Sequence, residues 1–245
     1  MLTVILDTSG LLDLYEASGK EKYLILAIKL QRTQDDLFWD DNNGGYFTSV
    51  KDEHILLRSK DAQVHLYLAF SNVCTLKWML LQDGAEPSAA SITLSNLTRL
   101  SHLDTIQTEK YSGKILQTYK SVAPLLERAP RALATSVIAL MQQVTGYRQF
   151  IVQGSPKSAQ VQAYLDVLHR RTFIPNRVLI HLDPEQPPRE LETRNAVVKS
   201  LVVDIEERRR QGELIEENVR LCEGFTCHLP VSEAVDVEKL VARNS

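Results

Sequence analysis

The chain has 245 residues, a length that is enough for one large domain or two small ones. Of these residues, 44% are hydrophobic and 24% are charged. Its net charge of −3 argues against a nucleic-acid or anionic-membrane partner, because either needs a clustered basic surface. No stretch reaches the roughly 18 apolar residues of a membrane span, and the start lacks the pattern of a signal peptide. We therefore expect a cytoplasmic protein.

The first part of the chain has the pattern of paired helices. Residues 10–17 and 20–36 are predicted to be two helices joined at Ser18-Gly19, where Gly19 can take the positive φ that often ends a helix. Asn and Gly then cluster between aromatic residues, which is typical of a turn. A hairpin with strands at residues 46–49 and 55–58 is the expected result.

Further helices are expected after this hairpin. The segment Asp83-Gly-Ala-Glu-Pro-Ser88 is predicted to open a helix that runs to about Leu100, because Pro and Ser suit the first turn or the cap. Residues 111–128 and 131–145 have the same helical character. Residues 1–147 are therefore interpreted as helical, with one hairpin.

The pattern changes after Gly146. Short apolar runs at 150–152 and 177–182 flank a predicted helix at 158–170, which favours a βαβ unit with parallel strands. Residues 195–210 favour a helix, although their paired valines could equally form a strand. A strand at 225–229 and a helix at 235–243 complete a small α/β segment over residues 148–245.

The three cysteines are too few for a disulfide scaffold. Four residues separate Cys222 from Cys227, and His228 follows directly. This spacing fits neither a four-ligand structural zinc site nor a C-x-x-C redox motif, so ordinary packing is favoured over a metal or redox role. The chain also has no phosphate loop and no dinucleotide fingerprint, and we expect neither metal nor cofactor.

Several short stretches, taken in order, carry a family resemblance. They are Gly10-Leu-Leu-Asp-Leu-Tyr-Glu-Ala17, Leu37-Phe-Trp-Asp40 with Gly44-Gly-Tyr-Phe47, Asp83-Gly-Ala-Glu-Pro-Ser88, Ile174-Pro-Asn-Arg177 and Cys222-Glu-Gly-Phe-Thr-Cys-His-Leu-Pro230. Together they resemble the spermatogenesis-associated protein 20 family. That family combines an N-terminal thioredoxin-like domain with a long (α/α)6 barrel similar to six-hairpin glycosidases and sugar 2-epimerases.

The resemblance implies a mainly α fold with a small α/β tail. Residues 1–147 would be the C-terminal part of an incomplete (α/α)6 barrel of the six-hairpin glycosidase type, and residues 148–245 a βαβ-containing segment. The thioredoxin-like domain and the early helix pairs would be missing, and that domain is an expected partner.

Residues 64–82 depart from the family pattern. Removing these 19 residues joins Arg58-Ser-Lys-Asp-Ala-Gln63 to Asp83-Gly-Ala85 without a gap, as in the family. Every Val codon begins with GT and one Gln codon is CAG, so a segment from Val64 to Gln82 is what a retained GT…AG intron would encode. We favour this interpretation over a genuine hydrophobic helix that covers the barrel.

The candidate site consists of residues in the loop motifs. Sugar chemistry needs a general acid and a general base within reach of one ring, and Asp83, Glu86 and Asp40 are the candidate catalytic carboxylates. Trp39, Tyr46 and Ser88 are the candidate substrate-binding residues, with a small-molecule sugar as the expected ligand. The structural alternatives are a plain helix cap for Glu86 and Ser88, a turn-holding role for Asp40, and core packing for the aromatic residues.

The functional hypotheses differ in class. In its complete form the protein would be carbohydrate-active, as an epimerase or a glycosidase relative, although a fold analogy alone carries this expectation. The alternative is a non-catalytic or redox-linked, fertility-associated protein whose barrel is a binding module. In that case the present chain would be inactive alone. Convergent carboxylates in a cleft would favour the first hypothesis.

Overall fold

The computed structural model describes residues 1–52, 83–84, 86–224 and 226–242. The chain divides into two compact units. Unit 1 comprises Met1–Tyr15, Lys22–Ser101 and Gln107–Gln143, and unit 2 comprises Glu16–Glu21, His102–Ile106 and Val144–Ser245. The predicted strand at 55–58 and the predicted insertion at 64–82 lie outside the described residues.

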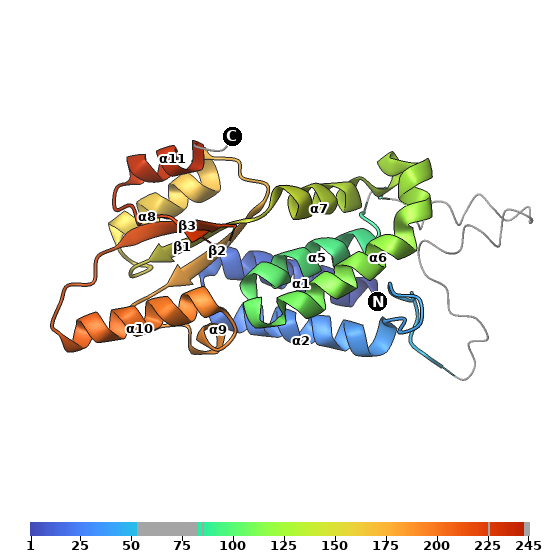
Figure 1. The fold of residues 1–245 in the computed structure, drawn as a ribbon, viewed down its shortest axis with the longest axis horizontal. Helices are drawn as coiled ribbons and strands as arrows, with labels where there is room; N and C mark the ends of the chain where they lie inside the picture. The colour runs from blue at the N-terminus through green and yellow to red at the C-terminus, as the bar shows by residue number, and fades with distance from the viewer. Residues whose placement is uncertain (53–82, 85, 225, 243–245) are drawn as a thin grey trace, which may run out of the picture. The chain divides into compact units, whose positions relative to one another are not determined.

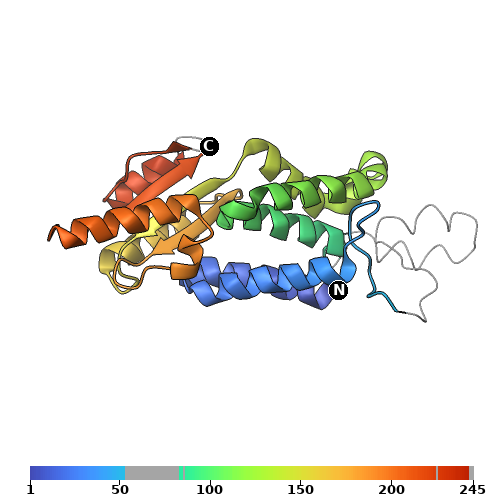
Figure 2. The ribbon, with the colours of Figure 1, turned by 60° about the horizontal axis from the view of Figure 1, so that its bottom comes forward.

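Unit 1 is helical in its described part. Its elements are α1 (Leu2–Ser18), α2 (Glu21–Phe38), α5 (Ala89–Leu103), η1 (Thr105–Gln107), α6 (Thr108–Arg128), η2 (Pro130–Leu133) and α7 (Ala134–Thr145), some of which extend into unit 2 at one end. Within the unit, α1, α2, α5 and α6 lie side by side (Figures 1 and 2). The predicted helices are therefore present, with ends that shift by a few residues, except that α1 begins well before Gly10.

The early start of α1 follows from the side chains that it buries. Ile5, Thr8, Leu12 and Tyr15 recur at spacings of three and four and are all at most 1% exposed. This spacing places them on one helical face, which packs into the core. Polar pairs add specific links between helices: Asn96 Nδ2 of α5 donates to the backbone O of Ile5 at 3.0 Å.

The turn after α2 is compact. Trp39 and Tyr46 form an isolated antiparallel bridge, and the backbone N–H of Phe47 donates to the carbonyl of Phe38 at 2.8 Å. Gly44 has φ +70°, and a Cβ atom there would lie 2.6 Å from the Cβ of Gln117 on α6. Tyr46 thus takes part in an isolated bridge, and residues 46–49 do not form the longer strand that was expected.

Unit 2 is built on a four-stranded mixed sheet. Its strands are β1 (Arg148–Gln153), β2 (Arg177–Leu182), β3 (Asn218–Glu223) and β4 (Thr226–Cys227), in the order β2-β1-β3-β4. β1 and β2 are parallel, whereas β3 is antiparallel to both β1 and β4. α8 (Ala159–Asp166), extended by a π-helical turn (Val167–Arg171), connects β1 to β2, so the predicted βαβ unit is confirmed.

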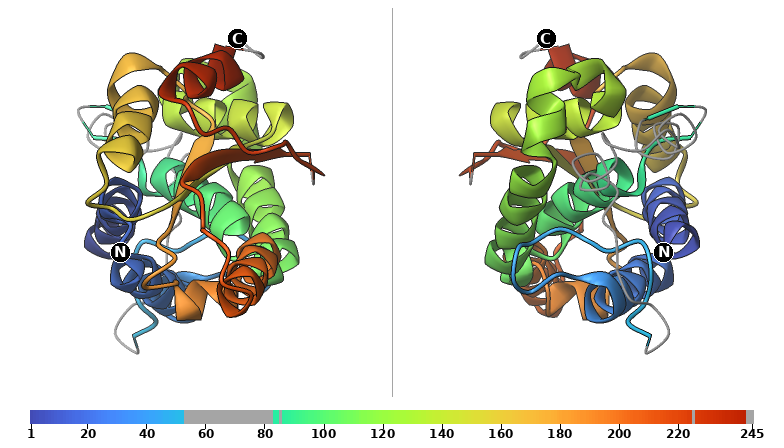
Figure 3. Two further views of the ribbon diagram at one scale, coloured as in Figure 1. Left: turned by 90° about the vertical axis from the view of Figure 1, so that its left-hand side faces the viewer. Right: turned by 90° about the vertical axis from the view of Figure 1, so that its right-hand side faces the viewer.

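Helices cover both faces of this sheet. α8 and α11 (Ala234–Ala242) lie on one face, and α10 (Ala196–Arg210) lies on the other; the short α9 (Arg189–Glu192) precedes α10 (Figures 1 and 3). The core on the first face contains Phe150, Val152, Tyr164, Leu221 and Leu240. The valine-rich segment at 195–210 is a helix: Asn195 caps its start through hydrogen bonds from the N–H groups of Val197 and Val198, and its buried residues recur at helical spacing, namely Val198, Leu201, Val202 and Ile205.

The final strands differ from the prediction. The expected strand at 225–229 is reduced to the two residues of β4, and the longer strand β3 was not predicted. The structure is mainly helical with a small mixed sheet, and the closure of the helical part into an (α/α)6 barrel stays a prediction. Among the described helices, none is long and apolar enough to cross a bilayer.

Candidate functional site

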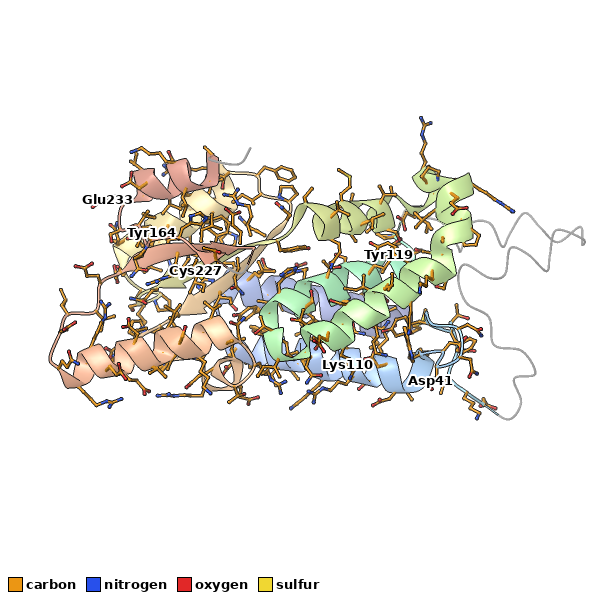
Figure 4. All side chains as sticks on the ribbon, viewed as in Figure 1. Asp41, Lys110, Tyr119, Tyr164, Cys227 and Glu233 are labelled. Carbon is orange, nitrogen blue, oxygen red and sulfur yellow. A yellow bond between two sulfur atoms is a disulfide. The ribbon has the colours of Figure 1, made fainter. Side chains whose placement is uncertain are left out.

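Asp40 organises the turn between Trp39 and Tyr46. Its Oδ1 accepts hydrogen bonds from the backbone N–H groups of Asn42 at 3.0 Å and Asn43 at 3.3 Å, and its side chain is almost fully buried. Asp41, by contrast, is exposed beside the end of α2 (Figure 4). The contacts of Asp40 are those of a turn-holding residue.

Asp83 joins the starts of two helices. Its Oδ1 accepts from the backbone N–H of Ser88 at 2.8 Å, and its Oδ2 accepts from that of Thr135 at 2.6 Å. Ser88 precedes α5 and Thr135 lies in the first turn of α7. A negatively charged group at these helix starts satisfies donors that lack partners within the helix.

Ser88 continues this arrangement into the core. Its Oγ accepts from the backbone N–H of Ser91 at 3.2 Å and donates to Ser91 Oγ at 2.9 Å, and Ser91 Oγ lies 2.7 Å from Ser136 Oγ. These hydroxyl groups are buried, so Ser88 acts as a cap. Glu86 is exposed, and its backbone O accepts from Gly84.

The structure therefore brings together some of the candidate residues. Asp83 contacts Ser88, and the rings of Trp39 and Tyr46 meet edge to face with their centroids 4.9 Å apart. Asp40 accepts hydrogen bonds from Asn42 and Asn43 of its own turn, whereas Asp83 accepts hydrogen bonds at the starts of α5 and α7. A shared catalytic centre would instead direct these carboxylates towards one substrate.

A polar cluster that the sequence did not reveal surrounds Tyr46. Tyr46 Oη donates to Asp35 Oδ1 at 2.7 Å, Gln31 Nε2 donates to the same oxygen at 3.0 Å, and Lys114 Nζ lies 3.5 Å from Asp35 Oδ2. Lys114 Nζ also lies 3.8 Å from the centre of the Trp39 ring, which is a cation–π contact. We call Gln31, Asp35, Trp39, Tyr46 and Lys114 the Asp35 cluster.

Burial controls the protonation of this cluster. Desolvation raises the pKa of Tyr46 well above its ordinary value, and the negative charge of Asp35 raises it further. Desolvation lowers the pKa of Lys114, while Asp35 opposes that shift. Tyr46 thus keeps its proton and serves as a donor. The i, i+4 spacing of Gln31 and Asp35 was visible in the sequence, but the contact with Lys114 depends on how α6 packs against α2.

Cys222 and Cys227 form a disulfide, which corrects the interpretation that they are ordinarily packed residues. The directly opposed pairing of these residues in β3 and β4 brings the sulfur atoms together. The sequence analysis missed this disulfide because it did not predict β3, and the spacing of the two cysteines alone does not show that they face each other. Within the described ranges, no group of three or more His, Cys, Asp or Glu side chains could hold a metal ion.

Comparison with known proteins connects the chain to named relatives, although no family model matches it. It is 32% identical over 234 residues to spermatogenesis-associated protein 20 of Rattus norvegicus and 31% identical over 238 residues to that of Homo sapiens. An uncharacterised protein of Caenorhabditis elegans is 31% identical over 232 residues. The matches cover 94–95% of the chain but only 26–27% of each relative, so the chain spans about a quarter of their length. The chain belongs to the spermatogenesis-associated protein 20 family.

Proposed function

We propose that this chain is a non-catalytic binding module of a longer family protein. The observation that carries this proposal is the use of Asp83 as a clamp: both of its oxygens accept backbone N–H groups, one before α5 and one in α7. A general acid or base exchanges protons with a substrate, so a carboxylate already committed to two amides is poorly suited to that role. Asp40 is similarly engaged by Asn42 and Asn43.

The aromatic candidates also favour packing over sugar binding. The ammonium group of Lys114 lies over the Trp39 ring, and the Tyr46 ring packs edge to face against it. Sugars stack on open aromatic faces, and Lys114 occupies one face of Trp39. The pair therefore supports a structural role in which it fastens the turn to α2 and α6.

The partner that we propose is another segment of the longer protein, with the thioredoxin-like domain as the first candidate. α1 exposes Leu2, Leu6 and Leu14, which are 39%, 42% and 47% exposed, and Gly10 lies between them at the same spacing of four. A Cβ atom at Gly10 would meet nothing within 4 Å. This leucine stripe is apolar and accessible, and the family relatives contain about three times more chain outside the matched region.

A binding experiment tests this role. The chain would be mixed with rat spermatogenesis-associated protein 20 that lacks the matched segment, and complex formation measured by sedimentation velocity. Leu6→Glu should abolish the complex, because it places a charge in the stripe, whereas the same substitution of an exposed leucine on another helix, Leu116→Glu on α6, should leave it intact. Equal binding by both variants, or no complex with the unsubstituted chain, would count against the proposal.

Carbohydrate-active chemistry is the second candidate, and Glu86 is the residue that favours it. This carboxylate is exposed close to the start of α5, in the same motif as Asp83. Turnover of a panel of hexoses and N-acetylhexosamines by a full-length relative, followed by NMR, would test it. Loss of turnover on replacing the residue equivalent to Glu86 by Gln, with unchanged stability, would support this second function over the first.

A further inference from the structure

The disulfide between Cys222 and Cys227 lies at an edge of the sheet in unit 2. β4 is the last strand in the sheet order, and its Cys227 is exposed, whereas Cys222 on β3 is 7% exposed (Figure 4). The two residues are direct partners in the antiparallel register. A solute can thus approach the disulfide from the side of Cys227.

The hairpin does not depend on this bond for its pairing. The backbone groups of Val219 and Val231 exchange two hydrogen bonds of 2.8 and 2.9 Å, and His228 N–H donates to the carbonyl of Leu221 at 2.8 Å. β3 is also paired with β1 along its length. Breaking the disulfide would leave these contacts in place, so unit 2 can accommodate both the oxidised and the reduced state.

A cation lies on the same face of β3 as Cys222. Side chains two residues apart in a strand point to the same face, so Arg220 and Cys222 share one face, and Glu223 points to the other. On that other face Glu223 lies 3.6 Å from Arg148. A guanidinium group near a cysteine favours its thiolate form, which makes Cys222 the better leaving group.

We propose that Cys222 and Cys227 are a redox site that accepts two electrons from a dithiol. A thiolate of the dithiol attacks Cys227 Sγ, the S–S bond breaks, and its electron pair leaves on Cys222 Sγ, which then takes up a proton. The second thiol of the reductant loses its proton and attacks the mixed disulfide. Cys227 is released as a thiolate and protonated, and the reductant departs as a disulfide. This site is independent of the binding role of α1.

The first test measures reduction of the folded chain. Cys74, which lies outside the described residues, is replaced by Ser, and the oxidised chain is incubated with dithiothreitol at pH 7.5 without denaturant. Thiols are then blocked with N-ethylmaleimide and mapped by mass spectrometry. We expect labelling of Cys222 and Cys227, an unchanged far-UV circular dichroism spectrum, and recovery of the bond with oxidised dithiothreitol. Reduction only in denaturant, or failure of the thiols to oxidise, would overturn the proposal.

The second test measures the direction of the reaction. In the Cys74→Ser background, Cys222→Ser leaves Cys227 as the free thiol, and Cys227→Ser leaves Cys222. We expect the thiol of Cys227 to react with Ellman's reagent at least about tenfold faster, because it is the accessible one. Equal rates would refute Cys227 as the attacked atom.

A third test asks whether Arg220 stabilises the Cys222 thiolate that leaves. Arg220→Gln should slow reduction by dithiothreitol about threefold or more, because the departing thiolate loses the cation on its face of β3. Arg210→Gln, a substitution of an exposed residue at the end of α10, should have no effect. Equal rates of reduction in the two variants would show that Arg220 has no role in the redox site.

Discussion

Asp83 is a clamp between helix starts, and its replacement should cost stability. In Asp83→Asn one oxygen becomes an NH2 group, which cannot accept a hydrogen bond, so either Ser88 or Thr135 loses its acceptor. We expect a loss of about 1–3 kcal/mol in the free energy of unfolding, measured by urea denaturation. The exposed Glu86 is the control, and Glu86→Gln should be close to neutral. An equal loss in both variants would contradict the clamp.

The Asp35 cluster should behave as one energetic unit at the residue scale. Tyr46→Phe removes the hydroxyl that donates to Asp35, and Asp35→Asn removes the charge that this hydroxyl and Lys114 share. Because the groups are in contact and largely buried, we expect the double variant to lose about 1 kcal/mol less than the sum of the single losses. The measurement is a double-mutant cycle by chemical denaturation, and strict additivity would show that the cluster is not coupled.

Among the elements, α10 depends on one buried cap. Asn195 is fully buried; its Oδ1 accepts from Val197 and Val198 at 3.1 Å each, and its Nδ2 donates to the carbonyl of Leu103 at 3.0 Å. Asn195→Ala should therefore cost about 2 kcal/mol and increase hydrogen exchange in the first turn of α10. Asn176→Ala is the matched control, because the Asn176 side chain donates an exposed hydrogen bond to the carbonyl of Gly146, and its backbone contact does not depend on the side chain. If Asn195→Ala increased hydrogen exchange only in helices other than α10, Asn195 would not be the cap of α10.

Elements with a strong local pattern could be predicted from the sequence, and those that depend on partners could not. β1 and β2 are short apolar runs around an amphipathic helix, so the βαβ unit was visible. β3 also alternates, with Val219 and Leu221 directed into the core, but only these two core residues carry the alternation, which is a weak signal in so short a segment. Without β3, the pairing of Cys222 with Cys227 could not be deduced.

At the scale of the whole molecule, the sequence identified individual residues of the candidate site but not the contacts that these residues make between helices. The loop motifs identified Asp40, Asp83 and Ser88, and each of these residues makes specific hydrogen bonds. These hydrogen bonds hold a turn or cap a helix. The ion pair of Asp35 and Lys114 joins helices that are far apart in the sequence. Such a pair follows from tertiary packing, which no local pattern encodes.

Unit 2 contains three histidines that should make its stability depend on pH. Burial lowers the pKa of His102 to about 4 and lowers the pKa values of His181 and His169 as well. His102 stacks on Tyr147 with ring centroids 4.6 Å apart, and because its pKa is lowered the imidazole is neutral at pH 7. The unfolded chain, with an ordinary histidine pKa near 6.5, binds these protons more readily than the folded chain.

The sign of the effect follows from this difference. The contribution of these histidines to the free energy of unfolding is fully present above about pH 6.5. It is lost as the pH drops towards 4, because the unfolded chain then binds more protons than the folded chain. His102 alone should contribute a loss of roughly 2 kcal/mol between pH 7.5 and pH 5. Urea midpoints at the two pH values measure it, and His102→Gln should flatten the dependence, since Gln does not titrate. A pH dependence that survives His102→Gln unchanged would rule out this buried imidazole as its main source.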